Sequence, residues 1–502
     1  MKFYVSNSII KIDFVMSIFK ILNIPNGKKM LKNISLITIS IFSAHVFADD
    51  SNIVNEAEAL AVDAKSYAAS YNVPFDEAVR RLLIMHGTSS EISNIRNNVK
   101  GELQGLYFTN GKNNFGLNVN VANYPKTLPR SLNIAPRSAT AIQNIIRSSG
   151  NLALRRQFNI TDTDMKTVAI QYSQPVTAPI HFNKQSYPTK LQRLNNIENK
   201  REQLKAALPL MHQAYDDERT GNTKIFVTAD NGSTKKIAES ILNTPVEIII
   251  SPRPTRVATR GGTPLLALEP QSVQGQIACF SGFIGKRNGV LGIVTAGHCA
   301  KVGQFSRYQY KDRDGTQYVI PLLTGASPTS GWRDDSVADL GFLPAGTSSA
   351  QLAKAEFYAD SSVNFRKLTA TKTRSGTAWD NGTVNGSYIC HLGKTGGYAT
   401  TLTQSCGEVE SINSANADNV GNTFVRVKNT NGSAGSTHTT GLGSLRCYHG
   451  DSGSPWFALT TGYGISHSCE WQTGGDDTTP ALYAIYTSLD YLSTIGTTIV
   501  IQ

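Results

Sequence analysis

The chain has 502 residues, which is longer than one ordinary domain and long enough to bury sizeable hydrophobic cores. Hydrophobic residues make up 40% of the sequence and charged residues 17%, so the composition excludes disorder as the default state. The formal net charge of +11 comes from residues before about 260, and the sequence shows no basic helix with interleaved aromatics. We therefore expect no nucleic-acid partner.

The first expected element is a secretory signal. Three lysines within residues 28–32 precede an apolar run, 34–42, and Ala48 stands just before an acidic pair. These features are typical of a signal peptide, so we expect residues 1–48 to be removed, with Met30 as an alternative start. Because the apolar run is too short to span a bilayer comfortably, we expect a secreted protein, extracellular or periplasmic, with no membrane association after removal of the signal.

Helix and strand patterns alternate after the signal. Residues 54–71 are rich in Ala at helical spacing, and Pro74 opens a second helix. Apolar residues alternate with polar residues or Gly over 115–121, which predicts a half-buried strand. A strand, a helix and another strand are expected within residues 225–250. The sequence therefore predicts a mixed α/β (α+β) region.

A Pro- and Arg-rich segment, 251–256, separates this region from a domain of different character. The segment breaks regular structure and indicates an exposed linker, so we assign residues 49–255 to the first region and 256–502 to the second. From about residue 261, Gly, Ser and Thr separate short apolar runs such as 290–296. This pattern predicts an all-β domain, either a barrel or a sandwich.

The cysteines indicate the compartment. All six lie in the second region, and none belongs to a CxxC pair. An even number confined to one domain predicts a disulfide framework in an oxidising compartment rather than a zinc site. The histidines likewise lack the spacing of metal ligands, so we expect no metal and no other cofactor. The six are Cys279, Cys299, Cys390, Cys406, Cys447 and Cys469.

A candidate nucleophile lies in segment 447–456, Cys-Tyr-His-Gly-Asp-Ser-Gly-Ser-Pro-Trp. A serine hydroxyl needs a base to remove its proton and hydrogen-bond donors for the oxyanion that its attack creates. Gly450 lets the backbone bend so that the N–H groups of Gly450 and Ser452 can form this oxyanion hole. By itself Gly-Asp-Ser-Gly fits a surface turn better, so the assignment of Ser452 depends on a partner elsewhere.

The candidate base is His298, in segment 294–299, Val-Thr-Ala-Gly-His-Cys, at the end of an apolar strand. A disulfide at the next residue would fix its backbone, although a packed or metal-binding histidine fits the residue alone about equally well. A third group must orient the imidazole, and Asp339 fits best because it opens an apolar strand and is placed for burial. Asp334 and Asp335 are alternatives in a polar loop.

These two segments, with an Asp between them, resemble the chymotrypsin family of serine peptidases. Segment 389–397, Ile-Cys-His-Leu-Gly-Lys-Thr-Gly-Gly, and the C-terminal run 486–500 are similar to its bacterial branch, the streptogrisins and α-lytic protease. The resemblance covers residues 261–502, roughly half of the chain. It implies an all-β double six-stranded antiparallel barrel, with a triad in the cleft between the barrels and acyl-enzyme chemistry. The residues concerned are His298, Asp339 and Ser452, and the implied disulfides are Cys279–Cys299, Cys390–Cys406 and Cys447–Cys469.

Segments 75–79 and 105–108 resemble the pro-regions of the same branch. Such pro-regions assist the folding of their own protease and inhibit it. The resemblance therefore implies that residues 49–255 are a pro-region and a partner of residues 256–502, which form a trypsin-like serine peptidase domain. We expect the cleavage that separates them between about 252 and 260.

The sequence departs from the family pattern beside Ser452. The residue that corresponds to Asp451 pairs with the new N-terminus in the animal enzymes and with an Arg in the bacterial branch, where this chain has His391. Our hypothesis is that protonated His391 pairs with Asp451 and holds the oxyanion loop in place. Lys394 and Arg446 are the alternatives.

The resemblance also implies a narrow specificity pocket. By position, Leu445 and Arg446 lie at its base, Ser466 and Ser468 on one wall and Ala481 on the other. Side chains at 468 and 481 replace glycines of chymotrypsin and trypsin, and no acidic residue lies at the base. We therefore expect small aliphatic residues before the cut bond. The alternative is an acidic residue, attracted by Arg446, His467 and Ser468.

The sequence therefore predicts a secreted serine endopeptidase that is made as a zymogen and acts as a monomer on protein or peptide substrates. The alternative is a catalytically inactive binding protein with a protease fold, such as an adhesin or a toxin. The chain keeps the nucleophile, the base and the oxyanion glycine, which argues against that alternative. An esterase of another fold would need a Gly-x-Ser-x-Gly elbow on an α/β pattern, which the sequence lacks.

Overall fold

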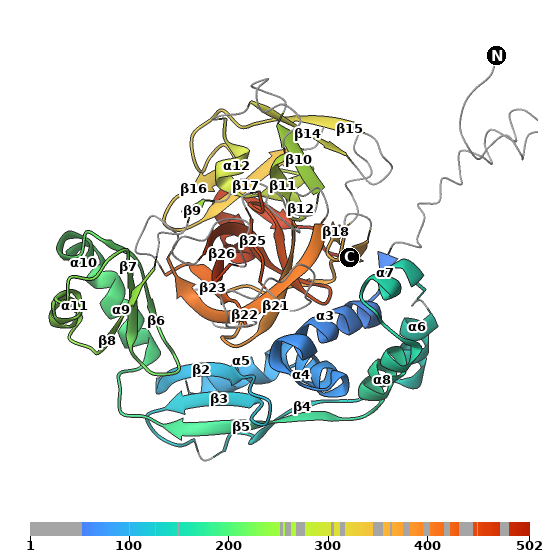
Figure 1. The fold of residues 1–502 in the computed structure, drawn as a ribbon, viewed down its shortest axis with the longest axis horizontal. Helices are drawn as coiled ribbons and strands as arrows, with labels where there is room; N and C mark the ends of the chain where they lie inside the picture. The colour runs from blue at the N-terminus through green and yellow to red at the C-terminus, as the bar shows by residue number, and fades with distance from the viewer. Residues whose placement is uncertain are drawn as a thin grey trace, which may run out of the picture. The chain divides into compact units, whose positions relative to one another are not determined.

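The computed structural model describes most of the unit Ser51–Gln502, whereas the expected signal peptide, residues 1–48, lies outside the described residues (Figure 1). No helix within the described part of the chain is long and apolar enough to cross a membrane. The described residues are 53–99, 101–125, 127–147, 150–251, 255–256, 263–267, 277–302, 306–311, 317–344, 355–361, 364–374, 382–394, 402–415, 422–430, 445–448, 450–471 and 481–502.

Three helices follow the short strand β1 (Ile53–Val54): α3 (Glu56–Tyr71), α4 (Phe75–Gly87) and α5 (Ser89–Asn98). Asn55 and Glu58 form a capping box at the start of α3, because each side chain accepts the backbone N–H of the other. The Ala-rich sequence of α3 is buried along most of the helix, which lets α4 and α8 pack closely against it. The first two helices lie where the sequence predicts them.

Two small sheets complete the N-terminal region. The first has the strand order β2-β3-β5-β4, and the expected strand at 115–121 is its β3. The second has the order β6-β7-β8, and β7, α11 and β8 are the expected strand, helix and strand. The elements are β2 (Leu103–Thr109), β3 (Gly116–Val121), β4 (Ser131–Ile134), α6 (Ala139–Arg147), α7 (Leu152–Gln157), α8 (Asp162–Ser173), β5 (Val176–Lys184), α9 (Lys190–Asn199), α10 (Arg201–Ala207), β6 (Met211–Asp216), β7 (Thr223–Val227), α11 (Thr234–Leu242) and β8 (Val246–Ile250).

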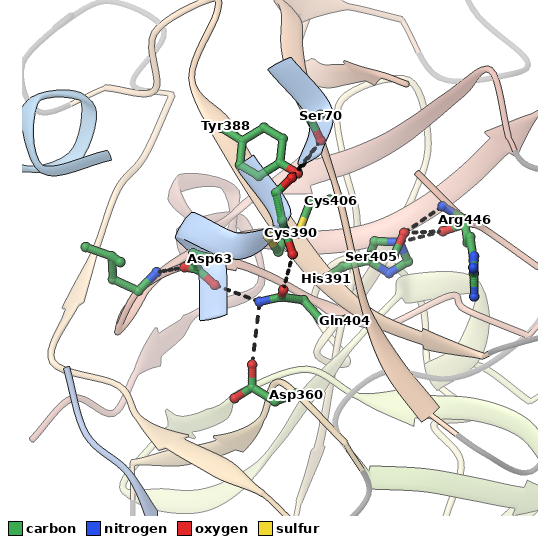
Figure 2. Close-up of a disulfide and its surroundings, with 12 residues drawn as sticks. Asp63, Ser70, Asp360, Tyr388, Cys390, His391, Gln404, Ser405, Cys406 and Arg446 are labelled. Carbon is green, nitrogen blue, oxygen red and sulfur yellow. Dashed lines mark hydrogen bonds between the residues drawn. A yellow bond between two sulfur atoms is a disulfide. The ribbon is translucent and has the colours of Figure 1, made fainter. Parts of the chain in front are cut away.

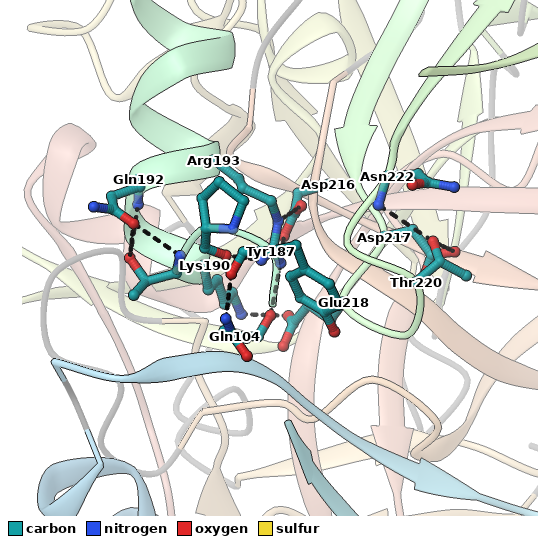
Figure 3. Close-up of polar contacts among 12 residues, drawn as sticks. Gln104, Tyr187, Lys190, Gln192, Arg193, Asp216, Asp217, Glu218, Thr220 and Asn222 are labelled. Carbon is teal, nitrogen blue, oxygen red and sulfur yellow. Dashed lines mark hydrogen bonds and ion pairs between the residues drawn. The ribbon is translucent and has the colours of Figure 1, made fainter. Parts of the chain in front are cut away.

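Buried ion pairs tie the second sheet to its neighbours (Figure 3). The Arg193 guanidinium of α9 donates to both carboxylate oxygens of Asp216 in β6, at 2.5 and 2.9 Å. The same guanidinium donates to the Gln104 carbonyl of β2 at 2.7 Å. Lys190 pairs with the buried Glu218 nearby. Because both charges of each pair are buried, loss of either partner would be costly.

The C-terminal region begins with two antiparallel sheets. Their strand orders are β11-β10-β14-β15 and β16-β17-β13-β12-β27, so the last strand of the chain joins the second of them. The bounds are β10 (Thr263–Ala267), β11 (Ile277–Ser281), β12 (Ile284–Arg287), β13 (Val290–Thr295), α12 (Gly297–Ala300), β14 (Arg307–Lys311), β15 (Gln317–Pro321), β16 (Trp332–Asp334), β17 (Asp339–Pro344) and β27 (Thr497–Ile499). Within the described residues these strands form a half-barrel.

Six of the remaining strands form a closed barrel, whereas β18 and β19 form a small sheet with β1 (Figure 1). The order β25-β24-β21-β22-β23-β26 returns to its start because β26 also pairs with β25. The bounds are β9 (Thr255–Arg256), β18 (Glu356–Tyr358), β19 (Phe365–Lys367), β20 (Ala370–Thr371), β21 (Tyr388–Lys394), β22 (Leu402–Ser414), β23 (Phe424–Lys428), β24 (Pro455–Ala458), β25 (Thr461–Glu470), β26 (Tyr483–Ser488) and the 3₁₀ helix η4 (Leu489–Ile495). The chymotrypsin-like fold class expected for this half is confirmed, with one six-stranded barrel closed and the other seen as a half-barrel.

All six cysteines are paired as the family resemblance implies: Cys279–Cys299, Cys390–Cys406 and Cys447–Cys469. Around the second disulfide, α3 of the N-terminal region contacts the closed barrel (Figure 2). Asp63 of α3 accepts a hydrogen bond from Gln404 Nε2 at 2.7 Å, and the Ser70 hydroxyl lies 2.8 Å from the Tyr388 hydroxyl. The two regions therefore share buried polar contacts.

Candidate active site

His298 lies in a short helix at the end of a buried strand. β13 ends at Thr295, and α12 carries His298 at its second position. Only glycine fits at 297, because a Cβ there would lie 1.8 Å from the Arg333 carbonyl oxygen. The disulfide at Cys299 fixes the residue after His298. The backbone of His298 is therefore constrained on both sides.

Asp339 opens β17 and lies against His298. Its Oδ1 accepts the His298 backbone N–H at 2.8 Å, and its Oδ2 lies 2.7 Å from His298 Nδ1. The Asp339 N–H donates to Thr487 Oγ1 at 3.1 Å. The two alternative acids have other partners, since Asp334 pairs with Lys301 and Asp335 with Arg333. Of the three carboxylates, Asp339 is the one that orients the imidazole.

The Asp339 carboxylate is fully buried and ionised. Burial alone would raise its pKa, but the positive charges available on His298 and His467 and the hydrogen bonds from both rings outweigh burial. Together they hold the pKa of Asp339 well below its ordinary value. An ionised carboxylate at this place can stabilise a positive charge on the adjacent imidazole.

Ser452 lies in a tight turn before β24. Gly450 and Gly453 adopt φ values of +120° and +90°, which side chains rarely tolerate. A Cβ on Gly453 would also come within 2.4 Å of the Phe280 carbonyl oxygen and of Thr295 Oγ1. The Ser452 hydroxyl is buried and donates to the His467 carbonyl oxygen at 3.3 Å. The turn therefore holds Ser452 beside a residue that also contacts Asp339.

The structure contradicts the expected pairing of His391 with Asp451. His391 Nδ1 lies 3.2 Å from Ser454 Oγ, and its Nε2 lies 2.8 Å from the Arg446 carbonyl oxygen. Burial lowers the pKa of His391 to about 4, so the ring is neutral near neutral pH. The Asp451 carboxylate instead accepts the backbone N–H groups of Lys394 and Tyr448, at 3.3 and 3.0 Å. The prediction was wrong because both imidazole nitrogens are used elsewhere.

His467 does not have the placement that the sequence suggested. It was expected near the specificity pocket, but its Nδ1 lies 2.6 Å from Asp339 Oδ2. Among the described residues, the side-chain atoms of His298, Asp339 and His467 that could bind a metal ion lie within 4.8 Å of one another. Short hydrogen bonds account for this geometry without an ion. Sequence spacing could not have found the contact, because β25 and β17 are brought together only by the fold.

The other residues expected in the pocket are all buried. Leu445 and Ala481 are buried in the barrel core, and Asn429 Nδ2 donates to both of their carbonyl oxygens, at 3.4 and 3.0 Å. Ser466 and Ser468 are buried, and their hydroxyls make no hydrogen bond to the described residues. Arg446 is buried as well, and its carbonyl accepts the hydroxyl of Ser405 at 3.0 Å. The sequence analysis did not identify Asn429, because this residue does not belong to a recognisable motif.

The segment at the expected domain boundary pairs with the edge of the barrel. β9 is antiparallel to β25, with Thr255 opposite Cys469 and Arg256 opposite Ser468. This pairing ends one residue before His467, whose carbonyl accepts the Ser452 hydroxyl. Residues 252–254 and 257–262, which include most of the expected cleavage region, lie outside the described residues. The backbone of β9 therefore occupies the strand edge next to Ser452.

Solved structures of serine proteases are similar to about half of this chain. A glutamic acid specific serine protease, described as using a novel histidine triad in substrate binding, is 20% identical over 48% of this chain and 99% of that chain, with a TM-score of 0.30. Protease A from Thermobifida fusca is 17% identical over 48% and 98%, with a TM-score of 0.27. An α-lytic protease homologue is 16% identical over the same shares, with a TM-score of 0.27. No family model and no curated protein matches the chain. Bacterial serine proteases are therefore among the solved structures that this chain is similar to.

Proposed function

We propose that the chain is the precursor of a serine endopeptidase with His298, Asp339 and Ser452 as its catalytic triad. The observation that carries the proposal is the double attachment of His298 to Asp339, through its backbone N–H at 2.8 Å and its Nδ1 at 2.7 Å. This arrangement fixes the ring with Nδ1 on the carboxylate, which leaves Nε2 as the basic nitrogen.

The mechanism follows from these three side chains. The Ser452 hydroxyl attacks the peptide carbonyl while His298 Nε2 takes its proton. The ionised Asp339 stabilises the imidazolium that forms, and the backbone N–H groups of Gly450 and Ser452 stabilise the oxyanion. His298 then protonates the leaving amine. A water molecule next attacks the acyl-enzyme carbonyl while His298 takes its proton, and His298 returns that proton to the departing Ser452 oxygen, which releases the acid product. No cofactor is required.

The N-terminal region is proposed to act as a folding assistant and inhibitor of this site. The pairing of β9 with β25 supports an inhibitory role, because a substrate that extends along β25 would need the same backbone groups. Cleavage between about 252 and 260 would end the continuity of this segment with the peptidase domain and generate the mature enzyme. Secretion through the expected signal peptide is consistent with three disulfides.

Small aliphatic residues are the proposed preference before the cut bond. Side chains at Ser468 and Ala481, both buried, reduce the space that glycines would leave. The alternative preference is an acidic residue, which Arg446, Ser468 and His467 would attract, and one similar structure is described as glutamic acid specific. The short bond of His467 Nδ1 to Asp339 argues against this alternative, because that nitrogen is not available to substrate. A peptide library separates them, and dominant cleavage after Lys, Arg or Phe would contradict both.

Labelling with a fluorophosphonate tests the activity itself. We expect the secreted wild-type protein to be labelled on Ser452 and the Ser452→Ala variant to remain unlabelled. Ser454→Ala is the matched control, because it removes a hydroxyl two residues away that bonds His391. Absence of labelling in the correctly folded, processed wild type would favour the inactive binding protein. N-terminal sequencing and intact mass of the secreted form would identify both cleavage sites.

A further inference from the structure

Two imidazoles share one oxygen of the buried Asp339 carboxylate. His298 Nδ1 lies 2.7 Å and His467 Nδ1 2.6 Å from Asp339 Oδ2, and the two ring planes are inclined at 75° with centroids 6.0 Å apart. An ionised carboxylate only accepts hydrogen bonds, so each Nδ1 must carry a hydrogen. A carboxylate oxygen has two lone pairs, which is enough for both donors. The arrangement therefore assigns the same Nδ1–H tautomer to both rings.

His467 is held at this place by its surroundings. Its side chain is fully buried in β25, and its ring packs on Phe424 with a centroid distance of 5.2 Å. Within the described part of the chain, His467 Nε2 has no hydrogen-bond partner, so the bond to Asp339 is the one that satisfies the ring. Its carbonyl oxygen accepts the Ser452 hydroxyl at 3.3 Å. One residue therefore contacts Asp339 through its ring and Ser452 through its backbone.

We propose that His467 is a positioning residue of the triad, which holds the Asp339 carboxylate in place for His298 by donating a second hydrogen bond to Oδ2. The proposal rests on the proposed function, because positioning matters only if His298 and Ser452 react. Without the second donor, the carboxylate could rotate about its Cα–Cβ and Cβ–Cγ bonds and leave the imidazole less well oriented. The second donor also disperses the carboxylate charge, which weakens its attraction for a protonated His298.

The other charged groups near Asp339 do not replace His467 as a hydrogen-bond donor to its carboxylate. The elements that pack against β17 carry two ion pairs, Lys301 with Asp334 at 2.7 Å and Arg333 with Asp335 at 2.8 Å. Asp490 lies on η4, which contacts both β17 and β25. None of these side chains is a hydrogen-bond donor to Asp339 in the described residues, so none of them takes the place of His467.

The test compares two substitutions at 467 in the secreted and processed protein. His467→Asn keeps an amide N–H close to the position of Nδ1 but cannot titrate, whereas His467→Leu removes the donor and retains much of the volume. The rate of fluorophosphonate labelling and the kcat and KM for a cleaved peptide are measured against pH. We expect the Leu variant to lose about 10- to 100-fold in labelling rate and kcat with little change in KM, since a hydrogen bond to a charged group contributes about that factor.

The pH profile distinguishes positioning from a general loss of stability. Removal of the donor should move the acidic limb of the labelling rate to higher pH, because the carboxylate then stabilises the protonated His298 more strongly. The Asn variant should restore most of the labelling rate and of kcat. A folded Leu variant with the wild-type rate and the wild-type acidic limb would overturn the proposal, and so would an Asn variant as slow as the Leu variant.

A spectroscopic measurement on the unsubstituted site keeps the proposal testable if the Leu variant does not fold. The proton spectrum of ¹⁵N-histidine-labelled protein should contain two downfield imidazole N–H signals, and both should shift in Asp339→Asn. A single such signal would overturn the proposal. Failure of the proposed function looks different, because the wild type would then not be labelled although both signals are present.

Discussion

The contact between α3 and the closed barrel predicts that Asp63→Ala destabilises the whole chain. The Asp63 carboxylate accepts two hydrogen bonds from Arg366, at 2.9 and 3.1 Å, one from Gln404 Nε2 at 2.7 Å and one from the Leu459 backbone N–H at 2.8 Å. All of these groups are buried, and Figure 2 shows the bond between Asp63 and Gln404. Removal of the carboxylate therefore deprives four hydrogen bonds of their acceptor in a place that water does not reach.

The expected magnitude depends on what remains beside Arg366. Loss of one partner of a buried ion pair costs about 3–5 kcal/mol when the other charge is left uncompensated. Here Asp360 still binds the guanidinium through two hydrogen bonds, at 3.0 and 2.6 Å, so Arg366 keeps a counter-ion. The remaining cost comes from the unsatisfied Leu459 donor, from a Gln404 amide left with only its 3.5 Å bond to Asp360, and from the weaker hold on Arg366. We therefore expect a loss of about 2–3 kcal/mol in the free energy of unfolding.

Ser66→Ala is the matched control. Ser66 lies one turn further along α3, and its hydroxyl donates to the Oε1 of the same Gln404 at 3.1 Å. Both groups of that bond are neutral, so its loss should cost only about 1 kcal/mol. Urea unfolding followed by fluorescence measures both variants in a Ser452→Ala background, which prevents self-cleavage. Equal losses in the two variants, or a smaller loss in Asp63→Ala, would refute the argument from buried charge.

Three further predictions concern the site. Burial lowers the pKa of His391 from 6.5 to about 4 in the folded state, so protonation of this ring favours the unfolded state. The fold therefore keeps its full stability above pH 6.5, and we expect about 3 kcal/mol to be lost from the free energy of unfolding as the pH falls towards 4. Urea unfolding against pH should show a shallower decline in His391→Gln. Gly453→Ala should abolish fluorophosphonate labelling and lower the free energy of unfolding by more than about 1–3 kcal/mol, because it adds close contacts to an unfavourable φ. Gly289→Ala is the control, because its φ of +82° is also unfavourable but the added Cβ would lie in open space. Asp339→Asn should slow labelling by at least about 100-fold while Ser452 stays in place, and an unchanged rate would remove Asp339 from the mechanism.

Local segments of the sequence predicted the parts of the site that local backbone geometry determines. Segment 294–299 ends a strand and opens α12, and segment 447–456 supplies the positive-φ glycines on either side of Ser452. The helices at α3 and α4 follow from Ala content, Pro74 and helical spacing, so their positions were also predictable. These features depend on neighbours within a few residues, which a single sequence shows directly.

Contacts between distant strands were beyond the reach of the sequence. His391 and Asp451 were paired by analogy, but the direction of the His391 ring is set by Ser454 and by the Arg446 carbonyl, 63 and 55 residues away. His467 has no spacing signal that relates it to Asp339, which is 128 residues earlier. Its side chain reaches the carboxylate only because β25 and β17 lie side by side in the fold. Charge and spacing alone could not choose among these partners.

The buried charges of the C-terminal region suggest how the N-terminal region would carry out the folding role proposed for it. Asp63 forms a buried ion pair with Arg366, and the Lys372 ammonium donates to the Met85 carbonyl oxygen at 3.2 Å. Burial, and then the positive charge of Arg96, lower the pKa of Lys372 to about 8. Burial of such a charged group early in folding is costly until its partner is in place. A barrel built from strands far apart in sequence also folds slowly. We expect the α3–α4 pair, which carries Asp63 and Met85, to lower the cost of burying these charges if it forms before the barrel is complete.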